Sequence, residues 1–365
     1  MENIITTVVA ISGITGFLAL LLSIANRTIA NYGEKKLIIN EEKEYIVEGG
    51  DNLLSTLNEQ DIFIPSACGG KGSCGYCKVK VIEGGGQFLA TEKGYVSETE
   101  RLDGIRLSCQ LRVKEDIRIE IPEELFNVKQ YEYTVTILED LTDKIKRVRL
   151  ELPETQEINY KPGQYIQILT PIYDGNEEVY RAYSITTPPS SKHAIELFIG
   201  YVPDGICTTY IHKHLKVNDK LSIVGPFGDF YYREGDKEMV LVAIGTGMAP
   251  IMGILRYMNE NHIERKATLY FGARTRSDMF MTDELKELEK TMYDFEYINC
   301  LSRPTAHCEW DGKVGRVTDL IEKFVDNGES KEAYLCGSPP MIDSVIPILK
   351  EKGFTDGDIY FDKFD

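Results

Sequence analysis

The chain of 365 residues is longer than one ordinary hydrophobic core supports, so two or three domains are expected. Hydrophobic residues make up 42% and charged residues 27%, a balance that excludes a disordered chain. The formal net charge of −17 argues against nucleic acid as a partner, and against anionic lipid as the main partner of the folded part. Eight cysteines are too few for a secreted disulfide scaffold.

The first element is an apolar run, residues 3–25, that contains no charged side chain. A helix needs about 20 such residues to cross a bilayer, so we predict a single-pass transmembrane anchor, with residues 1–33 as anchor and linker. Arg27, Lys35 and Lys36 follow the run and only Glu2 precedes it. By the positive-inside rule the rest of the chain lies in the cytoplasm, at the inner (cytoplasmic) membrane. A cleaved signal peptide is the alternative, but its positively charged n-region is missing.

Residues 34–127 contain two short strands, a helix capped by Asp51 and further strands, which predicts a small α+β domain. The segment "ACGGKGSCGYC" (67–77) places three cysteines among glycines, and a fourth follows after 31 intervening residues: Cys68, Cys74, Cys77 and Cys109. A four-cysteine zinc site usually has two close C-x2-C pairs, and a disulfide loop conflicts with the cytoplasm. Because glycines let the backbone curl and aim N–H groups at sulfur, we favour a [2Fe–2S] cluster over both.

Residues 128–234 alternate short strands with turn signals, which predicts an antiparallel β-barrel. The segment "RAYSI" offers a charge for a diphosphate, a ring that stacks and a hydroxyl near flavin N5, from Arg181, Tyr183 and Ser184. The later "GICTTY" offers a diphosphate site at a helix start, from Gly205, Thr208 and Thr209. The alternative for Thr208 is a helix N-cap. This segment is therefore expected to bind a flavin nucleotide.

Residues 235–365 alternate strands with helices, which predicts a parallel α/β sheet. Ligands of open sheets bind at the carboxyl ends of the strands, and glycine turns there bring N–H groups to a pyrophosphate. The candidates at three such ends are Gly245, Gly247, Arg274, Cys336 and Gly337. For Cys336 a buried core position is the alternative.

The second of these strand ends also bears on the choice of nucleotide. A 2′-phosphate needs dedicated cations there. Arg274 and Arg276 are present, but Asp278 and Asp283 follow, and "GARTRSDMFMTDE" contains no lysine. The sequence therefore favours NADH over NADPH.

In chain order, R-x-Y-S, G-x-x-[ST], G-T-G-x-A-P and C-G-x-P-x-M resemble the ferredoxin–NADP reductase superfamily. The apolar run followed by C-x5-C-x2-C is similar, more narrowly, to the F subunits of sodium-translocating NADH:quinone reductases. The resemblance implies a β-grasp [2Fe–2S] ferredoxin domain, a six-stranded FAD barrel and an NAD-binding α/β domain. It implies cluster ligands at Cys68, Cys74, Cys77 and Cys109, FAD at Arg181, Tyr183, Ser184 and Thr208, and nucleotide at Gly247, Arg274 and Cys336, with Phe364 over the flavin. Ser184, Cys336 and Phe364 are then the residues expected to act in catalysis.

The expected cofactors define an order of electron transfer. NADH gives two electrons together and a [2Fe–2S] cluster takes one at a time, so the flavin must stand between them. We predict a membrane-anchored NADH dehydrogenase subunit that feeds integral membrane redox subunits, through which electrons reach a quinone such as ubiquinone, coupled to sodium transport. One alternative is a tethered NADH-dependent reductase for an oxygenase or an anaerobic acceptor. A non-catalytic interaction or redox-sensing subunit is another.

Overall fold

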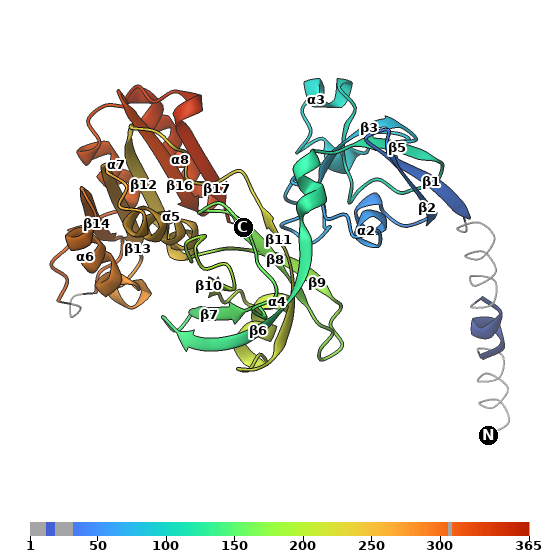
Figure 1. The fold of residues 1–365 in the computed structure, drawn as a ribbon, viewed down its shortest axis with the longest axis horizontal. Helices are drawn as coiled ribbons and strands as arrows, with labels where there is room; N and C mark the ends of the chain where they lie inside the picture. The colour runs from blue at the N-terminus through green and yellow to red at the C-terminus, as the bar shows by residue number, and fades with distance from the viewer. Residues whose placement is uncertain (1–11, 19–31, 306–308, 365) are drawn as a thin grey trace. The chain divides into compact units, whose positions relative to one another are not determined.

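The computed structural model describes residues 12–18, 32–305 and 309–364. The chain divides into two compact units, Met1–Val128 and Lys129–Asp365 (Figure 1), and each is described by itself. Residues 12–18 are helical, and the rest of the anchor predicted over residues 3–25 lies outside the described residues. In the part of the chain that the structure describes, no helix combines the length and the apolar character needed to cross a membrane.

The first unit is a small α+β fold around one five-stranded sheet. Its elements are β1 (Glu34–Ile39), β2 (Lys43–Glu48), α2 (Leu53–Asn58), β3 (Lys78–Glu83), η1 (Ala90–Glu92), α3 (Glu98–Leu102), β4 (Ile105–Leu107), β5 (Ile117–Glu120) and η2 (Glu123–Asn127). The strand order is β2-β1-β5-β3-β4, and only β1 and β5 run parallel. Alternate side chains on these two strands, such as Leu37 and Ile119, are fully buried. The α+β prediction for this segment agrees with the structure.

The cap of α2 differs from the prediction by one residue. Asn52, not Asp51, is the N-cap, and its side-chain oxygen accepts the Ser55 N–H at 2.9 Å. The Asp51 carbonyl instead accepts the Val113 N–H at 2.9 Å. Backbone pairing thus extends through Asp51, and the helix begins only after it.

The second unit begins with an antiparallel lobe. Its elements are β6 (Lys129–Asp140), β7 (Ile145–Glu151), β8 (Tyr165–Thr170), β9 (Val179–Ser184), β10 (Ala194–Gly200), α4 (Ile206–Lys213) and β11 (Lys220–Phe227). The six strands form one curled sheet in the order β10-β7-β6-β11-β8-β9. A bridge between Ile185 and Leu197 joins the end of β9 to β10, so the two outer strands meet. The predicted antiparallel strands are confirmed.

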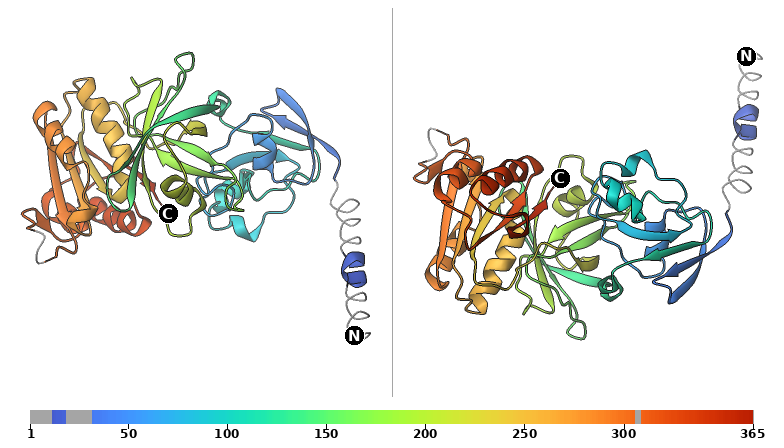
Figure 2. Two further views of the ribbon diagram at one scale, coloured as in Figure 1. Left: turned by 90° about the horizontal axis from the view of Figure 1, so that it is seen from below. Right: turned by 90° about the horizontal axis from the view of Figure 1, so that it is seen from above.

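The second lobe of this unit is a parallel sheet with helices on both faces (Figure 2). Its elements are β12 (Glu238–Ile244), η3 (Gly245–Gly247), α5 (Met248–Glu260), β13 (Ala267–Ala273), η4 (Arg276–Asp278), α6 (Thr282–Thr291), β14 (Phe295–Leu301), β15 (Lys313–Val314), α7 (Val317–Phe324), β16 (Lys331–Gly337), α8 (Pro339–Glu351), η5 (Asp356–Asp358) and β17 (Ile359–Lys363). The strand order is β15-β14-β13-β12-β16-β17. Successive residues of β12 point to opposite faces: Leu241 packs with α5 and α6, and Val242 packs with α7 and α8.

Helix α5 contacts both lobes of the second unit. Arg256 on α5 pairs with Glu196 of β10 at 2.8 Å and with Glu284 of α6 at 2.6 Å. One helical turn earlier, a Cβ on Gly253 would lie 2.7 Å from the Ile185 carbonyl oxygen, so the helix backbone lies directly against the end of β9. This joint holds the carboxyl ends of β12 and β13 beside the curled sheet.

Candidate functional site

The four predicted cluster cysteines lie in the first unit as two pairs of thiols. The Sγ atoms of Cys68 and Cys74 are 3.3 Å apart, and those of Cys77 and Cys109 are 3.2 Å apart. Among the described residues, no group of three or more His, Cys, Asp and Glu side chains is placed around a single metal ion. A [2Fe–2S] cluster takes four cysteines, two on each iron, so two pairs of thiols are the donor set that it requires.

The loop around these cysteines supplies hydrogen-bond donors to sulfur. Four of its glycines have positive φ, between 65° and 84°, which other residues rarely adopt: Gly69, Gly70, Gly72 and Gly75. The pKa of Cys68 is lowered, chiefly by the hydrogen bond with the Cys74 thiol and also by the Ser73 and Lys71 backbone. The Gln110 amide lies 3.5 Å from the Cys109 sulfur. The hydrogen bond within each pair, together with burial, raises the pKa of Cys74 and Cys77, so one thiol of each pair is favoured as thiolate, the form that binds iron.

The predicted flavin residues lie on β9 and at the start of α4. Arg181 and Tyr183 are two apart on the strand and share one face. The Tyr183 hydroxyl donates to the Cys207 sulfur of α4 at 3.2 Å, so this face of β9 meets α4. Ser184 points the other way and is 4% exposed. The structure thus brings Arg181 and Tyr183 to the helix, and it buries the Ser184 hydroxyl that was expected near the flavin.

The two threonines near the start of α4, Thr208 and Thr209, differ in their contacts and exposure. Gly205 is the N-cap, so the alternative reading of Thr208 as the cap residue does not hold. The Thr208 hydroxyl instead accepts the Val202 N–H at 3.2 Å and lies 3.1 Å from the Val202 carbonyl oxygen. It is 8% exposed, whereas Thr209 is only half-buried. Thr209 and the first backbone N–H groups of α4 are therefore more accessible to a diphosphate than the Thr208 hydroxyl.

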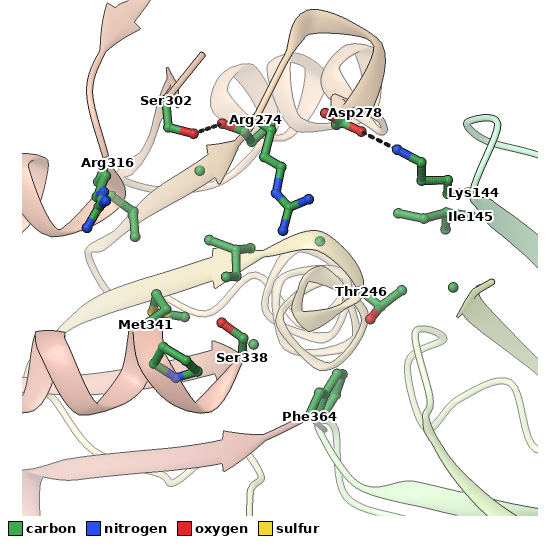
Figure 3. Close-up of a pocket in the computed structure, with 18 of the residues that line it drawn as sticks. Lys144, Ile145, Thr246, Arg274, Asp278, Ser302, Arg316, Ser338, Met341 and Phe364 are labelled. Carbon is green, nitrogen blue, oxygen red and sulfur yellow. Dashed lines mark hydrogen bonds and ion pairs between the residues drawn. The ribbon is translucent and has the colours of Figure 1, made fainter. Parts of the chain in front are cut away.

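A cavity of about 690 Å³ lies at the carboxyl ends of β12, β13, β14 and β16 (Figure 3). Three of the predicted nucleotide residues line it, Gly245, Arg274 and Gly337, and so does Phe364, which was expected over the flavin. Phe364 follows β17, and its N–H donates to the Gly337 carbonyl at 2.9 Å. The Arg274 side chain reaches into the cavity from the end of β13 (Figure 3). Strand ends that are far apart in the sequence are thus gathered at one site, as the open-sheet rule predicts.

Two predicted residues, Gly247 and Cys336, do not line this cavity. Cys336 is fully buried in the core beneath α5 and α6, and burial raises the pKa of its thiol. Gly247 lies against it: a Cβ on Gly247 would be 2.2 Å from the Cys336 carbonyl oxygen. The structure therefore places the Cys336 side chain as a core residue, the alternative reading, and Gly247 at a close backbone contact.

Several residues of the cavity were missed by the sequence analysis. Lys144 precedes β7 and Tyr201 follows β10, while Ser302 and Arg316 follow β14 and β15. The segment "FEYINCLS" contains the strand signal for β14, and "GRVTDLIEKF" has the spacing of an amphipathic helix. Reading these two segments as another strand and helix would have placed Ser302 and Arg316 at the same edge of the sheet.

Family models match the chain in three consecutive segments. The 2Fe-2S iron-sulfur cluster binding domain matches residues 37–114, the oxidoreductase FAD-binding domain matches residues 132–232, and the oxidoreductase NAD-binding domain matches residues 241–346. A relative from Neisseria gonorrhoeae, named as the F subunit of the Na(+)-translocating NADH-quinone reductase, is 36% identical and covers 99% of both chains. The F subunit from Serratia proteamaculans is 34% identical over 99% of both. The chain belongs to this family of F subunits.

Solved structures with the same fold include electron-transfer reductases. The Amycolatopsis cytochrome P450 reductase GcoB has a TM-score of 0.74 and 26% identity, over 90% of this chain and 98% of that one. A ferredoxin reductase in carbazole 1,9a-dioxygenase has a TM-score of 0.70 and 24% identity, over 91% and 98%, and shows the fold alone. With the family and its three domains, the resemblance and the expected cofactors FAD, NADH and [2Fe–2S] are confirmed.

Proposed function

We propose that this chain is the NADH-oxidising subunit of a membrane-associated NADH:quinone reductase that transports sodium. Electrons enter from NADH, pass through FAD and the [2Fe–2S] cluster, and leave to integral membrane subunits, which deliver them to quinone. The observation that carries the proposal is the likeness to the F subunits over 99% of the chain. The three matched domains supply the cofactors for this order of transfer.

In this proposal the second unit binds the nucleotide and the flavin, and the first unit binds the cluster. FAD supplies the chemistry that converts a hydride into single electrons. In the second unit, Arg274 and the N–H groups near Gly245 and Gly337 would hold the nucleotide, and Phe364 would cover the flavin until nicotinamide displaces its ring. In the first unit, the pair Cys68–Cys74 and the pair Cys77–Cys109 would each hold one iron.

We propose further that residues 3–25 anchor the chain, as a single-pass helix, with both folded units in the cytoplasm. The support is the run of 23 residues without a charge and the lysines and arginine that follow it. Deleting residues 1–26 should give a soluble protein that retains FAD and iron and still reduces ferricyanide with NADH. Loss of FAD or iron from the truncated protein would assign these residues to a core instead.

One observation favours a second candidate function. The likeness to GcoB, a cytochrome P450 reductase, extends over 90% of this chain. On this alternative, the subunit delivers electrons to an oxygenase or another redox partner rather than to a quinone reductase.

Copurification from native membranes separates the two candidates. The tagged full-length chain is extracted in mild detergent, and its companions are identified by mass spectrometry. Integral membrane subunits that support sodium-stimulated NADH:quinone reduction would support the first function. An oxygenase partner, with no sodium effect, would support the second. Flavin absorption that NADH fails to bleach would exclude both.

A further inference from the structure

A fully buried hydroxyl lies beside the cluster cysteines of the first unit. The Ser108 side chain is 0% exposed, and its Oγ forms no hydrogen bond with a nitrogen or oxygen atom of the described residues. A buried hydroxyl without a partner destabilises a fold, and native structures rarely contain one. The candidate partners of this hydroxyl are therefore the sulfur atoms of the neighbouring cysteines.

Backbone pairing places Ser108 opposite Cys77. The Ser108 N–H donates to the Cys77 carbonyl at 2.8 Å, and this bond continues the antiparallel pairing of β3 with β4, in which Lys78 faces Leu107. Residues directly opposite one another have Cβ atoms about 5 Å apart, so their side chains can form a hydrogen bond. The Cys109 thiol and burial raise the pKa of Cys77, and the Ser108 hydroxyl opposes this rise, as a donor to the Cys77 sulfur does.

Gln110 supplies a second side-chain donor next to Cys109. Its Nε2 lies 3.5 Å from the Cys109 Sγ and 3.5 Å from the Cys109 carbonyl oxygen. The cluster loop leaves room for this amide at Gly72, because a Cβ there would lie 2.6 Å from the Gln110 Nε2. Ser108 and Gln110 thus flank Cys109 in the chain and provide one donor for each sulfur of the pair Cys77–Cys109.

Hydrogen-bond donors beside the ligand sulfurs affect the two oxidation states of a cluster unequally. A [2Fe–2S] cluster gains one negative charge when it is reduced, and its sulfur atoms carry much of the charge. A donor aimed at a ligand sulfur therefore stabilises the reduced state more than the oxidised state. The reduction potential rises as a consequence, and removal of the donor should lower it.

We propose that Ser108 and Gln110 raise the reduction potential of the cluster, as positioning residues that donate hydrogen bonds to the Cys77 and Cys109 sulfurs. The inference rests on the proposed function, because it deepens the role of the cluster as the acceptor of electrons from FAD. It adds no redox step: the cluster takes one electron at a time, and neither side chain gives or takes an electron or a proton. The higher potential favours transfer of each electron from the flavin to the cluster.

A redox titration of the full-length protein with its cofactors bound tests the inference without turnover. Dye mediators set the potential, and the paramagnetic signal of the reduced cluster is measured at each step. One hydrogen bond changes such an equilibrium about fivefold, so Ser108→Ala should lower the midpoint potential by about 40 mV, at 59 mV for each tenfold change in a one-electron equilibrium. Gln110→Ala should lower it in the same direction. Thr99→Ala and Gln87→Ala are the matched controls, because they shorten similar side chains at exposed positions of the same unit.

Iron content separates this role from a merely structural one, because the variants should keep their iron while the potential falls. A midpoint potential equal to that of the controls, or higher, at full iron content overturns the inference. If Ser108→Ala loses iron, Gln110→Ala decides, since Gln110 is only half-buried and its loss leaves no buried cavity. Failure of the inference is distinct from failure of the proposed function, because the mediators reduce the cluster without NADH or membrane subunits.

Discussion

Replacing Gly247 with alanine tests how closely the backbone is packed beside the nucleotide cavity, because the only change is one added methyl group. Its φ is −59°, which any residue adopts, so the substitution adds no backbone strain. The new Cβ would lie 2.2 Å from the carbonyl oxygen of Cys336, 2.5 Å from its carbonyl carbon and 2.8 Å from the Gly337 nitrogen. These three atoms are backbone of β16, a central strand, so they cannot rotate away as a side chain could.

The expected cost follows from this crowding. Overpacking a core by one methyl group costs about 1 to 3 kcal/mol, and a clash with a central strand lies at the upper end of that range. For a unit of this size, each kcal/mol lowers Tm by about 2 to 4 °C, so the variant should melt about 6 to 12 °C below the wild type. The shift of η3 away from β16 should also widen the gap between Gly245 and Gly337 and raise KM for NADH.

Thermal unfolding, followed by flavin fluorescence at saturating FAD, measures the first effect, and ferricyanide reduction measures the second. Gly235→Ala is the control, since a Cβ there meets no atom within 4 Å and its φ is not positive. A Gly247→Ala protein that melts within about 2 °C of the wild type would refute the packing argument. An increase in KM at unchanged Tm would instead mean that Gly247 is small to let the ligand approach.

Three further predictions concern the cluster, the flavin and pH. Cys77→Ala should lose iron yet keep FAD and the reduction of FAD by NADH. The control Cys300→Ala, at a buried cysteine far along the chain from the loop, should keep iron. Metal analysis and visible absorption measure the iron content, and full iron content in Cys77→Ala would contradict the ligand assignment. Phe364→Ala should retain FAD but change KM for NADH and the hydride-transfer rate in stopped flow, and unchanged kinetics would make the ring a packing residue. Glu92 is fully buried; burial alone would raise its pKa, but hydrogen bonds from Arg106 and from backbone N–H groups lower it below the usual 4.5. The Glu92 carboxylate therefore stabilises the fold above about pH 4.5, and this stabilisation is lost as the pH falls through the lowered pKa. The free energy of unfolding in urea should accordingly differ between wild type and Glu92→Gln, and the difference should shrink at low pH. A difference that stays constant with pH would show that the ion pair is not the cause.

The sequence was sufficient to predict the class of each folded segment and the cluster loop. Periodicity separates the antiparallel strands before Phe227 from the alternating strands and helices after Glu238, because the two patterns have different periods. The cysteine spacing also carried strong information, since only a few metal sites use four thiols among glycines. The boundaries of helices were harder to predict from the sequence. Asp51 and Asn52 are both good N-cap residues, and the tertiary pairing of Asp51 with Val113 decided between them.

The nucleotide site was harder to predict, because position along a strand gives the edge of the sheet but not the direction of a side chain. Cys336 lies one residue before the end of β16, and alternation points its side chain into the core beneath α5 and α6, whereas the last residue of the strand, Gly337, lines the cavity. The charge of a residue in the sequence is limited in the same way, because it does not show which partners the side chain has after folding. Asp278 reads as a carboxylate that repels a phosphate, but the sequence does not reveal that Thr275 and Lys144 already engage it.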